Sequence, residues 1–322
     1  MVCNIKDYPE QTLRGFVKNY SLPIQIYRPD FIEYYIELYD EYYDTKRKYR
    51  EFQNAVSKFN SINIFEEYKH NLTDTIIHEL KSTEAYKKFM ETPAEHMYEI
   101  LPKVCDVPFC KTVNIYTPDN HNKYFISIDL RRANYQALKF YNPDIVFNTP
   151  TFEHILAKYG CEYEYFLNSK NIRQVIFGNL DMPRMSRITR IERFLTQNIL
   201  KYIIGHLQFK PENVAVFTTD EIILKLPDDK WFDDEKLDRL KILIEDECSA
   251  NVHVENFKLN YIGNKFYVKE HKYDLPTFKG GSSIYFPQAY KHYTNQPLND
   301  MDLCFNYEGQ IARFLEPLKW DK

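Results

Sequence analysis

Residues 123–130 read KYFISIDL, a compact run of aromatic and β-branched residues that ends in an acidic side chain, Asp129, followed by Leu130. Runs of this length and composition, bounded by turn-forming residues, are typical of buried β-strands. The segment before it, TVNIYTPDNHN (112–122), is rich in turn formers. We therefore expect a buried strand that carries a carboxylate at its end, with a domain boundary just before it.

Upstream of this boundary the sequence predicts a mainly helical N-terminal region, residues 1–118. The stretch FIEYYIELYDEYYDTKRKYREFQNAVSKF (31–59) places apolar side chains at steps of three and four residues, as an amphipathic helix does. A second stretch, DTIIHELKSTEAYKKFMET (74–92), has the same periodicity and is followed by Pro93, which ends a helix. These helices are also where we expect a protein partner to bind.

Downstream, residues 119–322 contain both helical and strand patterns, which predicts an α+β fold. The periodicities indicate two helices and two β-hairpins: the helices RIERFLTQNILKYIIGHL (190–207) and DDEKLDRLKILIEDE (233–247), and the hairpins NVAVFTTDEIILKL (213–226) and VHVENFKLNYIGNKFYVKEH (252–271). The second hairpin should turn at residues 262–265.

Composition excludes several classes of protein. With 42 Lys and Arg against 46 Asp and Glu, the chain of 322 residues has a net charge of −4, so it is not a basic nucleic-acid coat. Only 8 glycines are present, too few for a collagen-like or multi-glycine dinucleotide-binding chain.

There is no apolar stretch of eighteen residues and no secretory leader pattern, so we expect an intracellular protein, in cytoplasm or nucleus, without membrane contact. The Lys-, Asn-, Ile- and Tyr-rich composition suggests an AT-rich genome, such as that of a virus or a protist.

Acidic residues stand at two strand ends that the chain separates widely. Asp129 closes the first strand, and Asp220 and Glu221 lie between the two halves of the hairpin 213–226. Mg²⁺ prefers hard oxygen ligands and keeps substrate phosphates in its coordination shell, so aspartates on neighbouring strands suit Mg²⁺ or Mn²⁺. The segment between them, 165–202, carries seven basic and only two acidic side chains, which fits an anionic substrate.

The order of three segments resembles motifs A, B and C of the DNA polymerase I-type (family A) polymerases. The segments are ISIDLRRANYQAL (126–138), KNIRQVIFGNLDM (170–182) and VFTTDEIILKL (216–226). In that family the motifs are an apolar strand with Asp, a basic helix with a Phe-Gly step, and Asp-Glu before an apolar strand. The resemblance implies a reduced polymerase palm-like antiparallel sheet in residues 119–322, and a nucleotidyl transfer reaction.

Roles for individual residues follow from the same resemblance. Asp129, Asp220 and the carbonyl of Leu130 would bind the metal, with Glu221 in a secondary role. The remaining residues would bind the nucleotide: Lys170 and Arg173 at the triphosphate, Phe177 on the base, and Asn134 and Tyr135 where the family discriminates between sugars. The family has Glu at the position of Asn134 and His at that of Thr219, so contacts with the sugar and the primer end are not implied.

Basic residues outside these motifs predict contacts with a nucleic-acid backbone. Arg184, Arg187 and Arg190 recur every three residues, which makes either a track for phosphates or a solvated helix stripe. Lys279 begins KGGSS (279–283), which could hold a phosphate or could be a plain turn before the aromatic run 284–293.

The combined expectation is a metal-dependent nucleotidyltransferase that acts on nucleoside triphosphates and binds nucleic acid. Two alternatives stay open: a catalytically inactive palm used for nucleic-acid binding or assembly, and a structural protein in which Asp129 caps a helix and Asp220 lies in a solvated hairpin turn. Only the transferase requires both aspartates to converge on one cleft.

Overall fold

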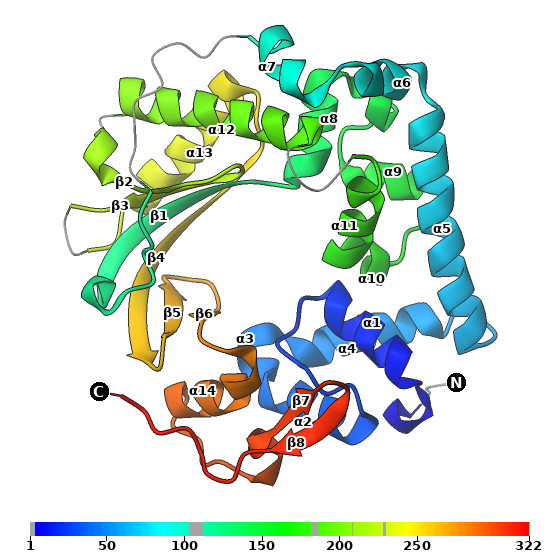
Figure 1. Ribbon diagram of the computed structural model, residues 1–322, viewed down its shortest axis with the longest axis vertical. Helices are drawn as coiled ribbons and strands as arrows, with labels where there is room; N and C mark the ends of the chain where they lie inside the picture. The colour runs from blue at the N-terminus through cyan, green and yellow to red at the C-terminus, as the bar shows by residue number, and fades with distance from the viewer. Residues whose placement is uncertain (1–3, 103–111, 182–185, 208, 228–229, 322) are drawn as a thin grey trace.

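The computed structural model describes residues 4–102, 112–181, 186–207, 209–227 and 230–321. It shows an α+β protein in which a mainly helical N-terminal region precedes a six-stranded antiparallel sheet with packed helices (Figure 1). The N-terminal helices are α1 (Glu10–Asn19), α2 (Pro29–Leu38), α3 (Asp40–Tyr43), α4 (Thr45–Val56), α5 (Ile62–Ser82), α6 (Glu84–Glu91) and α7 (Met97–Ile100).

The stretch 31–59 is helical, as predicted, but it is divided into three helices. Tyr39 separates α2 from α3, and Asp44 separates α3 from α4. Asp44 has a left-handed backbone with φ of 48°, which a short polar side chain tolerates better than most. The carboxylate of Asp40 accepts a hydrogen bond from the backbone amide of Lys46 at 2.9 Å and so stabilises the turn. No Pro or Gly marks this break in the sequence.

The sheet has the strand order β2-β3-β1-β4-β5-β6, and every neighbouring pair is antiparallel. The strands are β1 (Lys123–Leu130), β2 (Val214–Phe217), β3 (Glu221–Lys225), β4 (Val252–Gly263), β5 (Phe266–His271) and β6 (Thr277–Gly280). The strand predicted from KYFISIDL and both predicted hairpins are confirmed. The turn between β4 and β5 includes Gly263, Asn264 and Lys265, all with positive φ.

Helices connect the first four strands in a βαββαβ order. Between β1 and β2 lie α8 (Ala133–Tyr141), α9 (Phe152–Lys158), α10 (Glu164–Leu167), α11 (Lys170–Gly178) and α12 (Arg187–His206), and between β3 and β4 lies α13 (Asp234–Cys248). The helices predicted at 190–207 and 233–247 are therefore confirmed, with small shifts at their ends. Figure 1 shows α12 and α13 on one side of the sheet, while α10 and α11 lie across from its other side.

The two faces of the sheet have different compositions because side chains alternate along each strand. Ile126 and Ile128 of β1 belong to the main hydrophobic core, together with residues of α8, α12 and α13. Phe125 packs on the opposite face in a smaller apolar cluster with Phe257. Asp129 shares this opposite face with Phe125, so the carboxylate at the strand end points away from the main core.

The C-terminal part of the chain packs on the N-terminal helices. It contains α14 (Phe286–Tyr293) and the hairpin of β7 (Cys304–Tyr307) and β8 (Gln310–Arg313). The aromatic run 284–293 supplies buried side chains, with Phe286 and Tyr290 against Tyr39 of the N-terminal region. These aromatic side chains therefore have a structural role in the core. One continuous hydrophobic cluster includes residues from both sides of the boundary predicted at 118/119, so that boundary stays a prediction.

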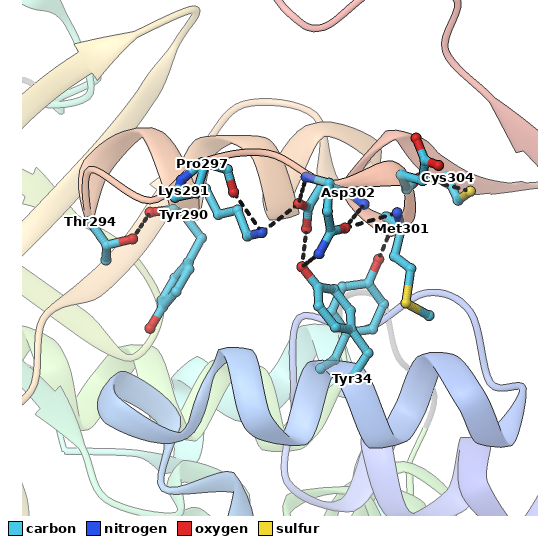
Figure 2. Close-up of polar contacts among 11 residues, drawn as sticks. Tyr34, Tyr290, Lys291, Thr294, Pro297, Met301, Asp302 and Cys304 are labelled. Atoms are coloured by element: carbon cyan, nitrogen blue, oxygen red, sulfur yellow. Dashed lines mark hydrogen bonds and ion pairs between the residues drawn. The ribbon is translucent and has the colours of Figure 1, made fainter.

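A buried ion pair within the C-terminal part is hydrogen-bonded to the N-terminal helices (Figure 2). Asp302 is fully buried, and its carboxylate lies 2.7 Å from the ammonium of Lys291 on α14. The hydroxyl of Tyr34 on α2 donates to the same carboxylate at 2.6 Å, and the backbone amide of Asn299 donates at 2.8 Å. A buried charge needs such partners because desolvation is otherwise costly. Asp302 thus connects segments that are 268 residues apart in the sequence.

None of the helices within the described ranges is both long enough and apolar enough to span a membrane. The location of the protein in the cell stays a prediction.

Candidate active site

The two predicted catalytic aspartates lie side by side at adjacent strand ends. Asp129 is near the end of β1, and Asp220 lies in the turn just before β3. Asp129 pairs in register with Glu221, and the backbone amide of Leu130 donates to the carbonyl of Asp220 at 2.8 Å. The antiparallel pairing of β1 and β3 therefore brings together residues that are distant in the sequence. Asp220 is exposed, and Asp129 is half-buried.

The pKa of Asp129 is affected by burial and by the acidic side chains near it. Its pKa is raised from 3.8 to about 6, first by burial and then by the charges of Asp220 and Glu221. His253, its register partner on β4, acts in the opposite direction. The negative charges of neighbouring carboxylates repel, and a cation bound between them removes that cost. The strand ends therefore form a site that favours a cation.

A cavity of about 290 Å³ opens at these strand ends. Its lining contains both aspartates and three basic side chains. Six of the lining residues were predicted for the site: Asp129, Leu130, Asn134, Lys170, Arg173 and Asp220; the others are Arg132, Ala133 and Gln174. Its volume is near the lower end of the range for small-molecule sites, so it suits the charged part of a ligand. The arrangement of acidic and basic groups can hold a metal ion and a phosphate together.

Two helices begin at this cavity. The first residues of α8, Ala133 and Asn134, line it, and so does Lys170 at the start of α11. Ser169 caps α11 by accepting a hydrogen bond from the amide of Ile172 at 3.0 Å. Helix N-termini present partial positive charge, which adds to the basic side chains and favours an anion.

A set of charged groups continues from Glu221 across the same face of the sheet. Ser127 donates to the carboxylate of Glu221 at 2.7 Å. On the next strands, the buried ammonium of Lys269 lies 2.9 Å from Glu255 and 4.3 Å from the centre of the Phe257 ring. The pKa of Glu255 is lowered to about 2 because its hydrogen bonds and nearby cations outweigh burial, which acts in the raising direction. Glu221 is thus held beside the aspartates, which is consistent with the secondary role predicted for it.

The nucleotide-binding roles predicted for Phe177 and Tyr135 are wrong, because both side chains belong to the core. Phe177 is 1% exposed and packs against Phe152 and Tyr135, so it offers no face for a base to stack on. Tyr135 is also buried, and its hydroxyl donates to the carbonyl of Thr149 at 2.5 Å. Both aromatic rings pack in the core, and a sequence pattern does not distinguish such packing from contact with a ligand.

The predicted arginine track is not a continuous stripe. Arg184 lies outside the described residues. The guanidinium of Arg187 is 3.2 Å from Asp181 and donates to the carbonyls of Thr92 and Met90, so it fixes α12 to α6 and is not available for phosphates. Its assignment to nucleic acid is wrong for that reason.

The other two predicted nucleic-acid contacts have different surroundings. Arg190 covers the ring of Tyr98 at 5.1 Å and does not line the cavity; its contact with nucleic acid stays a prediction. Lys279, on β6, is half-buried, and burial together with the charges of Lys269 and Lys170 lowers its pKa. It faces the same side of the sheet as Lys269. The predicted contact between Lys279 and a phosphate also stays a prediction.

The glycines after Lys279 have a structural role. Gly280 and Gly281 have φ of +71° and +61°. A Cβ atom on Gly280 would lie 2.3 Å from the carbonyl oxygen of Lys265, and one on Gly281 would lie 2.3 Å from the ring of Phe266. Both glycines are therefore required by a close backbone approach at the end of β6.

A buried glutamate behind the site was missed from the sequence. Glu192 of α12 is 7% exposed, and burial followed by the charge of Asp220 raises its pKa to about 8. One turn later, Thr196 donates to the carbonyl of Thr219 at 2.6 Å and so holds the turn that carries Asp220. The helical periodicity could have indicated that Glu192 is buried. Glu192 falls within the apolar stripe of its helix, between Ile188 and Leu195, where a solvated side chain is not expected.

The donor set is compatible with a hard divalent cation. Within the described part of the chain, no group of three or more His, Cys, Asp or Glu side chains is arranged to hold a metal ion. The cavity offers two carboxylates, with the backbone of Leu130 beside them. Mg²⁺ is commonly held by one or two carboxylates with the rest of its shell filled by water and substrate phosphates. Asp129 and Asp220 fit that pattern of binding, in which the substrate completes the shell.

A larger cavity, of about 790 Å³, lies between the end of α12 and the start of α13. Its two aspartates already have partners: Asp233 caps the helix by accepting from the amide of Lys236, and Asp234 lies 2.6 Å from the ammonium of Lys272. Its acidic groups thus have structural partners, whereas Asp129 and Asp220 together line the smaller cavity.

No family model, curated protein or solved structure matches the chain.

Proposed function

We propose that the protein is a metal-dependent nucleotidyltransferase that transfers a nucleotide from a nucleoside triphosphate to a hydroxyl group. The observation that carries this proposal is the convergence of Asp129 and Asp220 on one cavity that also contains Lys170 and Arg173. Carboxylates for a cation and basic side chains for phosphates are the two requirements of phosphoryl-type transfer, in which catalysis consists mainly of positioning and charge stabilisation.

The roles of the residues follow from their positions. Asp129 and Asp220 would hold Mg²⁺ or Mn²⁺, which would supply activation of the attacking hydroxyl and charge neutralisation at the leaving pyrophosphate. Lys170 and Arg173 enter from α11 and bind the triphosphate, assisted by the N-termini of α8 and α11. Asn134 lies at the cavity, where it can contact the sugar. In this proposal the sheet corresponds to the polymerase palm that the three sequence motifs resemble.

A second candidate is a catalytically inactive palm that binds nucleic acid or serves in assembly. The specific observation in its favour is that, over the described residues, the carboxylates do not form a group of three or more metal-ligating side chains. An inactive palm would keep the sheet and the basic residues of the cavity without turnover. Both candidates share the binding of phosphates and differ in the transfer step.

Incubation with labelled nucleoside triphosphates and Mg²⁺ or Mn²⁺, with and without an oligonucleotide primer, tests the proposal. Transfer of label to the primer is expected, and Asp220→Ala should abolish it. Asp238→Asn is the matched control, because Asp238 is an exposed aspartate on α13, on the opposite side of the sheet. Transfer that persists in Asp220→Ala would overturn the metal assignment, and absence of transfer in the unchanged protein would leave the inactive palm.

A further inference from the structure

Arg132 is a basic residue at the cavity that the sequence motifs do not assign. It directly precedes α8 and has a left-handed backbone, with φ of 55° and ψ of 51°. A residue with a Cβ adopts this conformation at an energetic cost, and such positions concentrate at functional sites. The side chain lines the cavity that contains Asp129 and Asp220.

The loop that carries Arg132 is fixed by hydrogen bonds on both sides. The amide of Arg131 donates to the carbonyl of Asn251 at 3.0 Å. The side-chain amide of Gln136 donates to the same carbonyl at 2.6 Å and accepts from the amide of Asn251 at 2.6 Å. The strained backbone of Arg132 is therefore held between β4 and α8, and its side chain has a defined direction.

Glu153 of α9 holds the guanidinium of Arg132. The two terminal nitrogens of the guanidinium each contact one carboxylate oxygen of Glu153. This fork-to-fork contact leaves the Nε–H and the outer N–H groups of Arg132 for another acceptor. Glu153 itself does not line the cavity, so it contacts Arg132 from outside the cavity.

Basic side chains gather in the cavity beside its two aspartates. Two guanidinium groups, those of Arg132 and Arg173, and the ammonium of Lys170 line it, and both arginines are half-buried. Crowded, partly desolvated cations of this kind are stabilised by a multiply charged anion, and guanidinium groups match phosphate oxygens in geometry.

We propose that Arg132 is a phosphate-binding residue for the nucleoside triphosphate and that Glu153 is its positioning residue. This inference rests on the proposed function, because it assigns the residues that bind the substrate of that reaction. Arg132 binds the oligophosphate from the start of α8, and Lys170 and Arg173 bind it from α11. Glu153 fixes the orientation of the guanidinium before the substrate arrives, with the Nε–H and the outer N–H groups left for the phosphate, which reduces the cost of ordering the side chain on binding.

Equilibrium binding to the full chain tests this assignment without requiring turnover. The probes are MgATP and inorganic tripolyphosphate, measured by calorimetry, with adenosine as the probe that lacks phosphates. Arg132→Ala should weaken binding of MgATP and of tripolyphosphate about tenfold to a hundredfold, the range for hydrogen bonds to charged groups. Arg132→Lys should also weaken both, because Lys lacks the fork. Arg131→Ala removes the same charge from an exposed neighbour and should change affinity less than about twofold.

The role of Glu153 is tested in a double-mutant cycle. Glu153→Gln should weaken binding of MgATP several-fold when Arg132 is present and should have no effect in Arg132→Ala. Equal effects in the two backgrounds, or wild-type affinity in Arg132→Ala, would overturn the inference while leaving the proposed function intact. Circular dichroism and melting temperatures check that each variant is folded.

Failure of the proposed function gives a different result. If the unchanged protein binds neither MgATP nor tripolyphosphate, both the proposed function and this inference are rejected. If it binds them through Arg132 but transfers no nucleotide, the inference holds and the inactive palm is the function.

Discussion

Removal of the carboxylate of Asp302 should destabilise the whole fold, because that carboxylate is the centre of the contact between the C-terminal segment and α2. In Asp302→Ala, Lys291 keeps its charge at a position that is 5% exposed and loses its partner at 2.7 Å. Tyr34 and the amide of Asn299 lose an acceptor as well. Breaking a buried ion pair by removing one member costs about 3–5 kcal/mol, a large part of the stability of a typical domain.

Urea unfolding followed by circular dichroism and by tryptophan fluorescence measures this loss. Trp320 stacks on His292 of α14 with ring centroids 4.1 Å apart, so it reports on the C-terminal segment. In Asp302→Ala the free energy of unfolding should fall by about 3 kcal/mol or more. If the segment detaches before the rest unfolds, the fluorescence transition will precede the circular dichroism transition.

Asp300→Ala is the matched control for this experiment. Asp300 lies two residues away and pairs with Arg313 at 2.6 Å, but both side chains are largely exposed. Exposed ion pairs contribute about 0–1 kcal/mol, so this variant should unfold almost as the unchanged protein does. A loss below 1 kcal/mol in Asp302→Ala, or equal losses in the two variants, would refute the reasoning.

Stability should also fall as the pH rises through the range of two raised carboxyl pKa values, those of Asp129, raised from 3.8 to about 6, and Glu192, raised from 4.5 to about 8. The folded protein then holds more protons than the unfolded chain between about pH 4 and pH 8. Urea titrations of Glu192→Gln should show a smaller loss between pH 6 and pH 8, and a profile identical to that of the unchanged protein would contradict the burial argument. Gly281→Ala should lower the melting temperature because its Cβ would meet the ring of Phe266, whereas Gly178→Ala, at the end of α11 with open space around it, should have little effect. Equal melting temperatures for the two glycine variants would show that the close approach at β6 is not required.

The parts of the fold that the sequence predicted are those set by local patterns. The strand 123–130 and the hairpin 252–271 have side-chain periodicities and turn residues that leave little choice of structure. The position of Asp129 and Asp220 at strand ends follows from those patterns. Their convergence depends on the pairing of β1 with β3, which the motif order anticipated and which composition alone does not determine.

The errors arise where tertiary packing decides the environment of a side chain. The residue types of Phe177 and Tyr135 are the same whether they contact a nucleotide or fill the core, and only the fold shows that they are buried. Arg187 was assigned to phosphates from its spacing, but an aspartate and two carbonyls from other segments bind it. The pairing of Arg132 with Glu153 joins a strand end to a different helix, and no local pattern indicates it.

The bond between Tyr34 and Asp302 has a consequence for the order of events during synthesis. A ribosome releases α2 long before it reaches Asp302, so part of the apolar surface of α2 stays in water during much of translation. Nascent chains in this state are prone to aggregate and are the usual clients of chaperones. The helix α2 therefore acquires its final contacts only when nearly all of the described polypeptide has emerged.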